Sequence, residues 1–282
     1  WGNLNERAEP GSLNSLDDTL QTSLGSLFHL AQALGRSRQV EDRRLLVVTR
    51  GAQAVSLGEG PRAEIAPLVS LAQTLPQELK GLRVRAVDLE PNAETSAEAK
   101  VLRDELQTTT GDVEVAWRGS KRYARRLVPA NKSAEPWAPE SGGVYLITGG
   151  LGGIARQVAH WLAETTGVRL VLTGRRELDE EARAWIAELQ SRGAAVEYHR
   201  ADVSDFDAVS LLVENIARQY GRLDAVFHTA GVLDRDTLSL RSKSYESFRE
   251  VMRPKVEGTL HLWRATRELA PARFVLFSSI SS

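Results

Sequence analysis

The stretch VYLITGGLGGIA, residues 144–155, decides the fold of the second half of this chain. It begins with four apolar or aromatic residues (144–147), which predict a buried strand. The segment TGGLGG (148–153) then predicts a tight turn, because glycine adopts positive φ freely and lets the backbone approach a ligand closely. Apolar residues continue at helical spacing from Ile154. A strand, a glycine-rich turn and a helix in this order are typical of a dinucleotide-binding βαβ unit, although such turns also occur without a ligand.

The start of the helix after this turn completes the predicted phosphate site. The first N–H groups of a helix have no intrahelical partner and lie at the positive end of the helix dipole, so they attract phosphate. A Cβ at Gly149 or Gly153 would meet the pyrophosphate or strain the turn, so we expect neither position to accept a larger residue. The residues predicted to bind the cofactor here are Thr148, Gly149, Gly150, Leu151, Gly152, Gly153 and Ile154.

The composition is that of an ordinary globular protein, with 42% apolar and 26% charged residues in a chain of 282. This length has room for one large or two ordinary domains. The formal net charge of −1 argues against nucleic acid or an anionic membrane as a partner, and no apolar run is long enough to span a bilayer. The lack of cysteine excludes disulfides and thiolate metal sites, and we predict no metal site.

Residues 1–127 are predicted to form a first α/β domain. Its helices are expected within 13–34, 65–79 and 97–106, and its strands at 45–49, 83–89, 113–117 and 123–127. The segment Arg50–Gln53 follows a strand, but its one glycine does not make a phosphate site. Residues 128–141, VPANKSAEPWAPES, have three prolines and little apolar pattern, which predicts a linker.

Residues 142–282 are predicted to form a second α/β domain that is incomplete at its C-terminal end. Alternating strands and helices imply a doubly wound parallel sheet that is covered on both faces, with ligands at the carboxyl ends of the strands. The chain starts with Trp and stops directly after a strand-like run, so we expect it to be a piece of a longer protein. The strands are expected at 144–147, 168–173, 195–199, 224–228 and 273–277, and the helices from 154, at 179–191, at 206–220 and at 248–269, the last broken near Pro254.

Two arginines follow the second strand of this domain. An acidic residue at this point favours NAD by bonding the ribose 2′-hydroxyl, whereas an arginine favours the 2′-phosphate of NADP. Here the strand is followed by Arg175 and Arg176, with no acid before Glu177. A guanidinium matches a phosphate in geometry and charge, so we predict that this pair selects NADPH. The alternative is an ordinary solvated arginine pair.

Asp202 and Val203 follow the third strand. The Asp202 carboxylate could accept a hydrogen bond from the adenine amino group, with the Val203 backbone beside it. The alternative is a helix cap, because Asp202 or Ser204 stands just before the helix expected from Phe206.

The fourth strand ends in FHTAG, residues 227–231. Ala230 and Gly231 are small enough to lie beneath the nicotinamide ribose. His228 is expected in or near the sheet and is not an obvious base.

Together these segments resemble the short-chain dehydrogenase/reductase superfamily and, more narrowly, the ketoreductase domain of a modular polyketide synthase. The first half is similar to the structural subdomain of such ketoreductases, a truncated Rossmann fold without cofactor that precedes the catalytic subdomain. The segments that carry the resemblance are LLVVTRGAQAV (45–55), APLVSLAQTL (66–75), LRVRAVDLE (82–90), WRGSKRYARRL (117–127), TGGLGG (148–153), TGRR (173–176), ADVSD (201–205), FHTAGVLD (227–234), PKVEGT (254–259) and FVLFSS (274–279).

The resemblance implies that NADPH reduces the β-keto group of an acyl chain on the phosphopantetheine arm of an acyl carrier protein, giving a β-hydroxyl. It also implies neighbouring synthase domains as partners and a cytoplasmic location. The family's Ser and Tyr hydrogen-bond the carbonyl oxygen, where charge develops, and Lys and Asn support the Tyr. On this sequence the Lys corresponds to Lys255 and the Ser to Ser279. The alternative is a non-catalytic domain that keeps the fold to organise its neighbours.

This sequence departs from the family pattern in three places. The last glycine of the loop is replaced by Ala155. Residues 233–235 resemble the Leu-Asp-Asp signature of one stereochemical class, but end in Arg235, so the sequence does not assign the product's configuration. The family's Tyr and Asn would lie beyond Ser282, and none of the five tyrosines of the chain takes that place. We therefore expect the 282-residue chain alone to bind NADPH weakly at best and not to turn over.

Overall fold

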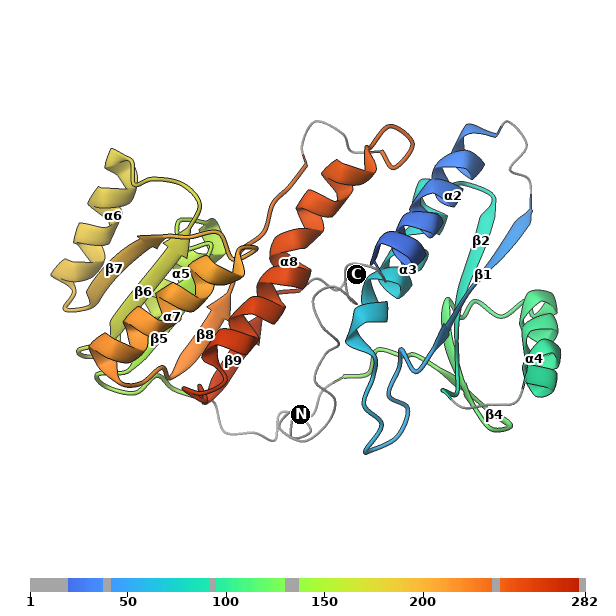
Figure 1. Ribbon diagram of the computed structural model, residues 1–282, viewed down its shortest axis with the longest axis horizontal. Coiled ribbons are helices and arrows are strands. Elements are labelled where there is room, and N and C mark those ends of the chain that lie inside the picture. Colours follow the sequence, from blue (N-terminus) through green and yellow to red (C-terminus); the bar gives the residue numbers. More distant parts are fainter. Residues whose placement is uncertain (1–19, 38–41, 92–94, 130–136, 235–238, 279–282) are drawn as a thin grey trace. The chain divides into compact units, whose positions relative to one another are not determined.

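The computed structural model describes residues 20–37, 42–91, 95–129, 137–234 and 239–278 (Figure 1). These residues form two compact units. Unit 1 contains the described residues of Trp1–Asn131 together with those of Thr237–Tyr245, and unit 2 contains those of Lys132–Asp236 and Glu246–Ile280. Because part of the predicted linker lies outside the described residues, the domain boundaries at 127 and 142 stay a prediction. No helix in the described ranges combines the length and the apolar character that crossing a membrane requires.

Unit 1 is built on a four-stranded sheet in the order β1-β2-β3-β4. The strands β1 (Arg43–Arg50), β2 (Leu82–Leu89) and β3 (Glu114–Arg118) are parallel, and β4 (Lys121–Ala124) is antiparallel to β3. The helical elements are η1 (Leu20–Leu24), α2 (Gly25–Arg36), η2 (Ala63–Ile65), α3 (Ala66–Glu78) and α4 (Thr95–Gln107). The first part of the helix predicted within 13–34 lies outside the described residues.

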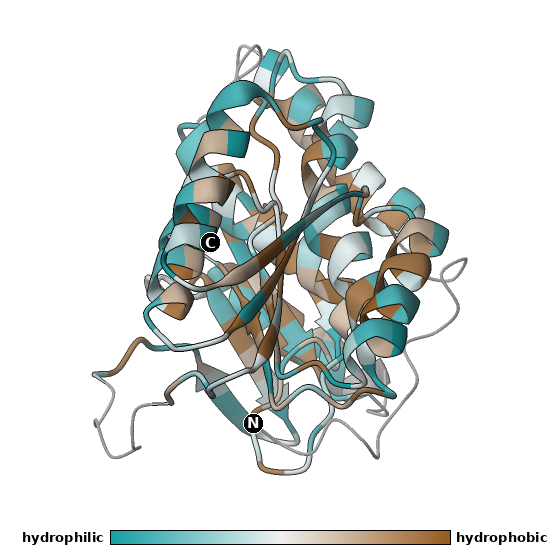
Figure 2. Cartoon of the chain, turned by 90° about the vertical axis from the view of Figure 1, so that its left-hand side faces the viewer, coloured by the Kyte–Doolittle hydropathy of each residue, from teal (hydrophilic) through white to brown (hydrophobic). Residues whose placement is uncertain are grey.

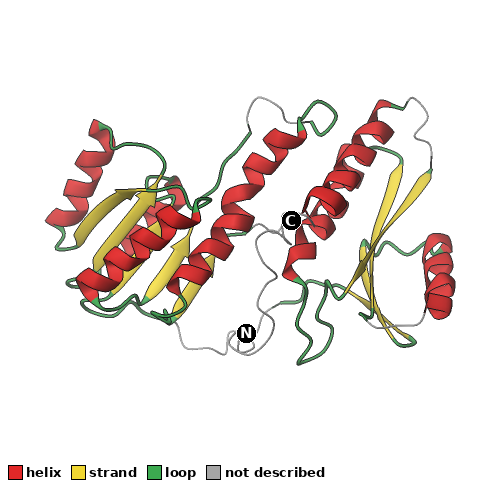
Figure 3. Cartoon of the chain, in the orientation of Figure 1, coloured by secondary structure: helices red, strands yellow, loops and turns green. Residues whose placement is uncertain are grey.

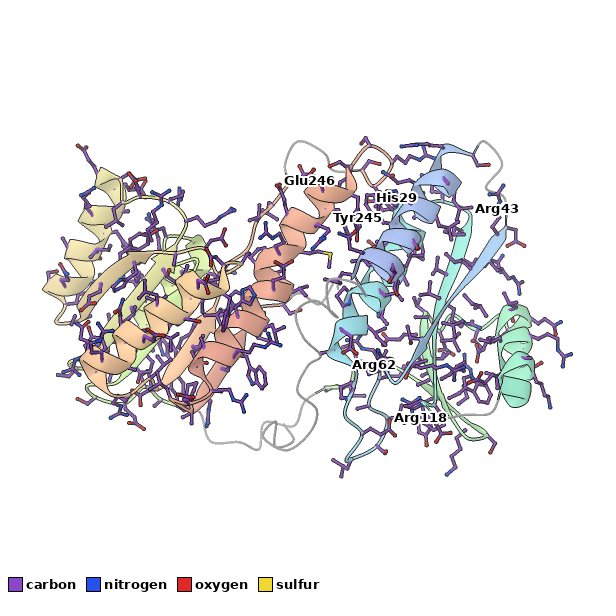
Figure 4. The ribbon with its side chains drawn as sticks, in the orientation of Figure 1. His29, Arg43, Arg62, Arg118, Tyr245 and Glu246 are labelled. Atoms are coloured by element: carbon purple, nitrogen blue, oxygen red, sulfur yellow. The ribbon has the colours of Figure 1, made fainter. Side chains whose placement is uncertain are left out.

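A segment far along the chain completes unit 1. Gln32 on α2 donates hydrogen bonds from Nε2 to the backbone oxygens of Leu240 (3.0 Å) and Lys243 (2.7 Å). The hydroxyl of Tyr245 donates to the Leu20 oxygen at 2.8 Å, and its ring lies 5.5 Å from that of His29 (Figure 4). Residues 239–245 are therefore bonded to α2 and η1 within unit 1.

Unit 2 has the predicted doubly wound parallel sheet. Its strand order is β7-β6-β5-β8-β9, with β5 at the centre and the chain moving outward first on one side and then on the other. The carboxyl ends of the neighbours β5, β6 and β8 lie beside this reversal, where α/β sheets bind ligands. The strands are β5 (Val144–Thr148), β6 (Arg169–Gly174), β7 (Ala195–Arg200), β8 (Ala225–His228) and β9 (Arg273–Leu276), and the helices are α5 (Gly153–Ala163), α6 (Glu180–Ser191), α7 (Phe206–Tyr220) and α8 (Tyr245–Thr266).

Alternate residues of these strands supply two separate cores. Tyr145 and Ile147 of β5 point to one face of the sheet, where they pack in one cluster with residues of α5 and α6. Val144 and Leu146 point to the other face and pack with α7 and with Leu262 of α8. All the β5 residues are buried, as a strand covered on both faces requires. Helices cover both faces of this sheet (Figure 3), and apolar and polar residues alternate along the helices (Figure 2).

The prediction that α8 breaks near Pro254 is wrong. The helix is continuous from Tyr245 to Thr266, and Pro254 is buried inside it. A proline removes one backbone hydrogen bond of a helix, but tertiary contacts can offset the loss. Here the Pro254 oxygen accepts a hydrogen bond from His228, and Gly258, one turn later, packs against Val203.

The alternative in which Asp202 or Ser204 caps α7 is wrong, because the capping residue is Asp205. Its carboxylate accepts hydrogen bonds from the backbone N–H groups of Asp207 (3.0 Å) and Ala208 (3.2 Å). Asp202 instead accepts from the N–H of Ser204 at 2.9 Å, which orders the turn before the cap. Three polar residues stand within the four positions 202–205, which left the sequence ambiguous, and the exact start of the helix decides between them.

We predict that Asp205→Ala lowers the free energy of unfolding by about 1 kcal/mol, because two N–H groups of the first turn of α7 lose their acceptor. Ser204→Ala is the matched control, since the Ser204 side chain does not cap the helix, and it should change stability by less than half as much. Chemical denaturation of both variants measures the difference. Equal losses in the two variants would contradict the assignment of the cap.

Candidate functional site

The first half of the glycine-rich turn is tied to the sheet. Thr148, the last residue of β5, is fully buried, and Gly149 has a φ of +64°. The N–H of Gly150 donates to the Thr173 oxygen at the end of β6 at 2.9 Å. A Cβ at Gly149 would lie 2.8 Å from the Cα of Ala230 after β8. The turn therefore lies directly against the end of β8, and the fold itself requires glycine at 149.

The second half of the turn faces outward. Gly152, Gly153 and Ile154 are exposed, and α5 begins at Gly153 with no side chain of the described residues capping it. A Cβ at Gly153 would meet no described atom within 4 Å, so the fold does not require glycine there. The first N–H groups of α5 are thus open to an anion. Leu151 differs, because its side chain packs into the core and only its backbone could reach a ligand.

Arg175, after β6, lies close to Asp202, after β7, because the two strands are parallel neighbours in the sheet. Nη1 of Arg175 lies 4.0 Å from Oδ2 of Asp202, and both side chains are well exposed. A pair at this distance in water contributes little to stability, which leaves the Arg175 guanidinium available to another anion. The Arg176 side chain is exposed as well.

Two β7 residues that the sequence analysis missed hold the backbone of this arginine turn. The hydroxyl of Tyr198 donates to the Arg176 oxygen, and Nε of Arg200 donates to the Arg175 oxygen at 3.0 Å. The Arg200 guanidinium also pairs with Glu177 at 2.8 Å. Polar residues at the end of the strand next to β6 were the only signal in the sequence, and their targets depend on strand register.

Val203 belongs mainly to the packing of α8. It is 5% exposed, and a Cβ at Gly258 would lie only 2.8 Å from its Cγ2. Its backbone oxygen lies 3.0 Å from Nδ1 of His261, which must donate because a carbonyl oxygen only accepts. The structure therefore fixes the turn after β7 against α8, with Asp202 at its exposed side.

Lys255 of α8 reaches the small residues after β8. Its Cε lies 3.7 Å from the position that a Cβ on Gly231 would take. Ala230, the preceding residue, is the one that contacts Gly149. The end of β5, the end of β8 and the first half of α8 thus meet at one edge of the sheet. Ser279 lies outside the described residues, so its position relative to Lys255 stays a prediction.

His228 is held at the end of β8, as expected. It is 5% exposed, with Nδ1 2.7 Å from the Thr148 hydroxyl and Nε2 2.8 Å from the Pro254 oxygen. Burial lowers the pKa of His228, and the hydrogen bond to Pro254 only partly opposes this. The ring is therefore neutral at pH 7 and has no free nitrogen to act as a base.

The corresponding turn of unit 1 is occupied by a carboxylate from its own chain. Buried Asp88, near the end of β2, accepts hydrogen bonds at Oδ1 from the N–H of Ala52 (2.8 Å) and at Oδ2 from the N–H of Gln53 (3.2 Å). The Arg118 guanidinium neutralises it at 2.9 Å. The two amides that follow Gly51 thus have acceptors within unit 1.

Comparisons with known proteins agree on one family. The family model described as the KR domain matches residues 143–282. Polyketide synthase PksN of Bacillus subtilis (strain 168) is 32% identical over 223 residues, which are 76% of this chain and 4% of that protein. A phenolphthiocerol/phthiocerol polyketide synthase polypeptide of Mycobacterium tuberculosis (strain CDC 1551 / Oshkosh) is 32% identical over 281 residues, which are 96% of this chain and 15% of that protein.

Solved structures give the same result. A ketoreductase domain from the bacillaene assembly line superposes with a TM-score of 0.79 at 27% identity, covering 99% of this chain and 63% of that one. The first ketoreductase of the tylosin PKS superposes with a TM-score of 0.78 at 34% identity, covering 92% of this chain and 55% of that one. This chain therefore spans somewhat more than half of the solved chains and a small part of the curated relatives.

The turn yields a prediction that separates two roles of glycine. Gly149→Ala should lower the free energy of unfolding by at least about 2 kcal/mol, because it combines a left-handed backbone with a clash against Ala230. Gly153→Val should leave the thermal unfolding temperature nearly unchanged but abolish binding of a dinucleotide at the start of α5. Thermal unfolding and a fluorescence titration with NADPH measure the two effects. Unchanged NADPH binding by Gly153→Val would show that a dinucleotide does not use this turn.

Proposed function

Because this chain belongs to the ketoreductase domains of modular polyketide synthases, within the short-chain dehydrogenase/reductase superfamily, we propose that it reduces the β-keto group of an acyl-carrier-protein-bound polyketide intermediate to a β-hydroxyl with NADPH. The observation that carries the proposal is the place of Lys255 beside Gly231 at the carboxyl edge of the sheet, with Cε 3.7 Å from where a Cβ on Gly231 would lie. A domain kept only to organise its neighbours has no need of a lysine there. The acyl carrier protein and adjoining domains of a cytoplasmic synthase are the proposed partners.

The residues at this edge fit a phosphorylated dinucleotide. In the proposal, the open N-terminus of α5 holds the pyrophosphate through the amides after Gly152. Arg175, with Arg176, holds the 2′-phosphate, and Asp202 accepts from the adenine amino group. Ala230 and Gly231 leave room for the nicotinamide ribose. When bound, NADPH supplies the hydride for the carbonyl carbon.

The protein's own task is to stabilise the oxygen on which negative charge develops. In the proposal, Ser279 donates a hydrogen bond to this oxygen, and the Tyr expected after Ser282 donates the proton. Lys255 supplies a positive charge that lowers the pKa of that Tyr. His228 cannot share this task, since it is buried and neutral with both ring nitrogens occupied.

We expect NADPH to bind more tightly than NADH, and Arg175→Ala to remove this preference. A charge-assisted hydrogen bond to phosphate contributes about 1.5–3 kcal/mol, so the variant should lose about one to two decades in NADPH affinity and little in NADH affinity. Arg192→Ala, at the end of α6, is the matched control and should bind both cofactors as the wild type does. Equal affinity of the wild type for the two cofactors would refute the role of Arg175.

Turnover tests the enzyme assignment against the non-catalytic alternative. A longer chain that includes the Tyr and Asn expected after Ser282 should oxidise NADPH in the presence of a β-ketoacyl thioester, whereas the 282-residue chain should not. Lys255→Ala and Ser279→Ala in the longer chain should each lower kcat about 10²-fold or more, with little loss of NADPH affinity for the Ser279 variant. Lys80→Ala, an exposed position in unit 1, is the control.

Two outcomes would contradict this assignment. Ketoreduction by the 282-residue chain alone would mean that another residue donates the proton. A longer chain that binds NADPH but never reduces the thioester would favour the non-catalytic alternative.

A further inference from the structure

Helix α8 has a proline directly before Lys255. Pro254 has no N–H, so the backbone oxygen of Glu250, four residues earlier, receives no hydrogen bond from position 254. The helix therefore lacks one backbone hydrogen bond at the residue next to the side chain proposed to act in catalysis. A contact from outside the helix at this point has more influence on the backbone than it would have in an uninterrupted helix.

That contact is the hydrogen bond from His228. Nε2 lies 2.8 Å from the Pro254 oxygen, and a carbonyl oxygen can only accept, so Nε2 carries the proton. Nδ1 must then accept from the Thr148 hydroxyl, 2.7 Å away. Oγ1 of Thr148 in turn accepts from the N–H of Ala230 at 3.3 Å. One chain of hydrogen bonds thus joins the residues after β8, the end of β5 and the middle of α8.

A second contact fixes the same face of α8 one to two turns later. Gly258 packs against Val203, and His261 donates to the Val203 oxygen at 3.0 Å. Pro254, Gly258 and His261 are all buried and lie on one side of the helix. The hydrogen bond of His261 fixes the position of the later part of α8, and the hydrogen bond of His228 fixes the position of the part that carries Lys255.

We propose that His228 is a positioning residue, whose Nε2–H bond to the Pro254 oxygen fixes the backbone at Lys255 so that the lysine side chain lies against Gly231. The inference rests on the proposed function, because the position of Lys255 matters only if Lys255 acts in the reaction. His228 itself touches neither substrate nor cofactor in this scheme. A merely structural role would instead make His228 stabilise unit 2 as a whole.

Two conservative substitutions separate these roles. The amide nitrogen of glutamine takes the place of Nε2, whereas that of asparagine takes the place of Nδ1. His228→Gln therefore keeps a donor for the Pro254 oxygen, and His228→Asn loses it while keeping a polar group near Thr148. Both variants leave a polar side chain of similar character in the same buried place.

Hydrogen exchange of the backbone amides, measured by mass spectrometry on the 282-residue chain, provides the test. In His228→Asn, amides 255–261 should exchange at least about tenfold faster than in the wild type, while those of α5 and α7 should not change. In His228→Gln, amides 255–261 should remain within about threefold of the wild type. Equal acceleration in both variants, or acceleration spread evenly over unit 2, would overturn the proposal.

The acylation rate of the Lys255 amine gives a second readout, relative to that of Lys80 in unit 1. It should rise at least about threefold in His228→Asn and not in His228→Gln, because only the former releases the lysine from Gly231. Unchanged reactivity in His228→Asn would overturn the proposal. If the Asn variant does not fold, His228→Leu, which also has no donor for the Pro254 oxygen, tests the same bond and should accelerate exchange in 255–261 at least about tenfold. Neither readout needs turnover, so failure here is distinct from failure of ketoreduction.

Discussion

The contact between Gly149 and Ala230 is the constraint on which the rest of unit 2 depends. A side chain at 149 would begin 2.8 Å from the Ala230 Cα, so only glycine lets the turn after β5 lie against the end of β8. Thr148 then reaches both Thr229, whose hydroxyl donates to its backbone oxygen at 2.6 Å, and His228. His228 in turn donates to the Pro254 oxygen, which links the end of β5 to α8. Removing the contact between Gly149 and Ala230 would separate the glycine-rich turn from the lysine that the proposed reaction needs.

The two units share an alternating α/β pattern but differ in the turn after their first strand, which is filled by a side chain in unit 1 and exposed in unit 2. In unit 1 the turn after β1 is filled by Asp88, whose charge is balanced by Arg118 and whose oxygens take up nearby amides. In unit 2 no side chain of the described residues caps the start of α5, and Gly152, Gly153 and Ile154 are exposed. An internal carboxylate satisfies the backbone as a bound phosphate would, so unit 1 keeps the fold without needing a ligand.

Much of this arrangement could be predicted from the sequence, because it depends on local pattern. The parallel sheet follows from the alternation of apolar runs and helical periods, and α7 has the predicted bounds 206–220. The errors concern tertiary contacts. Pro254 does not end its helix, since contacts from β8 and the turn after β7 hold it. Tyr198 and Arg200 were missed because their partners, the oxygens of the arginine turn, depend on the register between β6 and β7.

The groups proposed to hold the phosphates of the cofactor are positive although the chain as a whole is not. The net charge of −1 gives no sign of an anion site. Yet several positive groups lie at the carboxyl edge of one sheet, namely the start of α5, the side chains of Arg175 and Arg176, and Lys255. In the proposal each of them lies beside a different part of the dinucleotide. His228, the residue that would add a further charge beside Lys255, is kept neutral by burial. A protonated imidazole there would repel the lysine and would lose its acceptor role toward Thr148, so both the hydrogen bonds and the charge at this edge favour one protonation state.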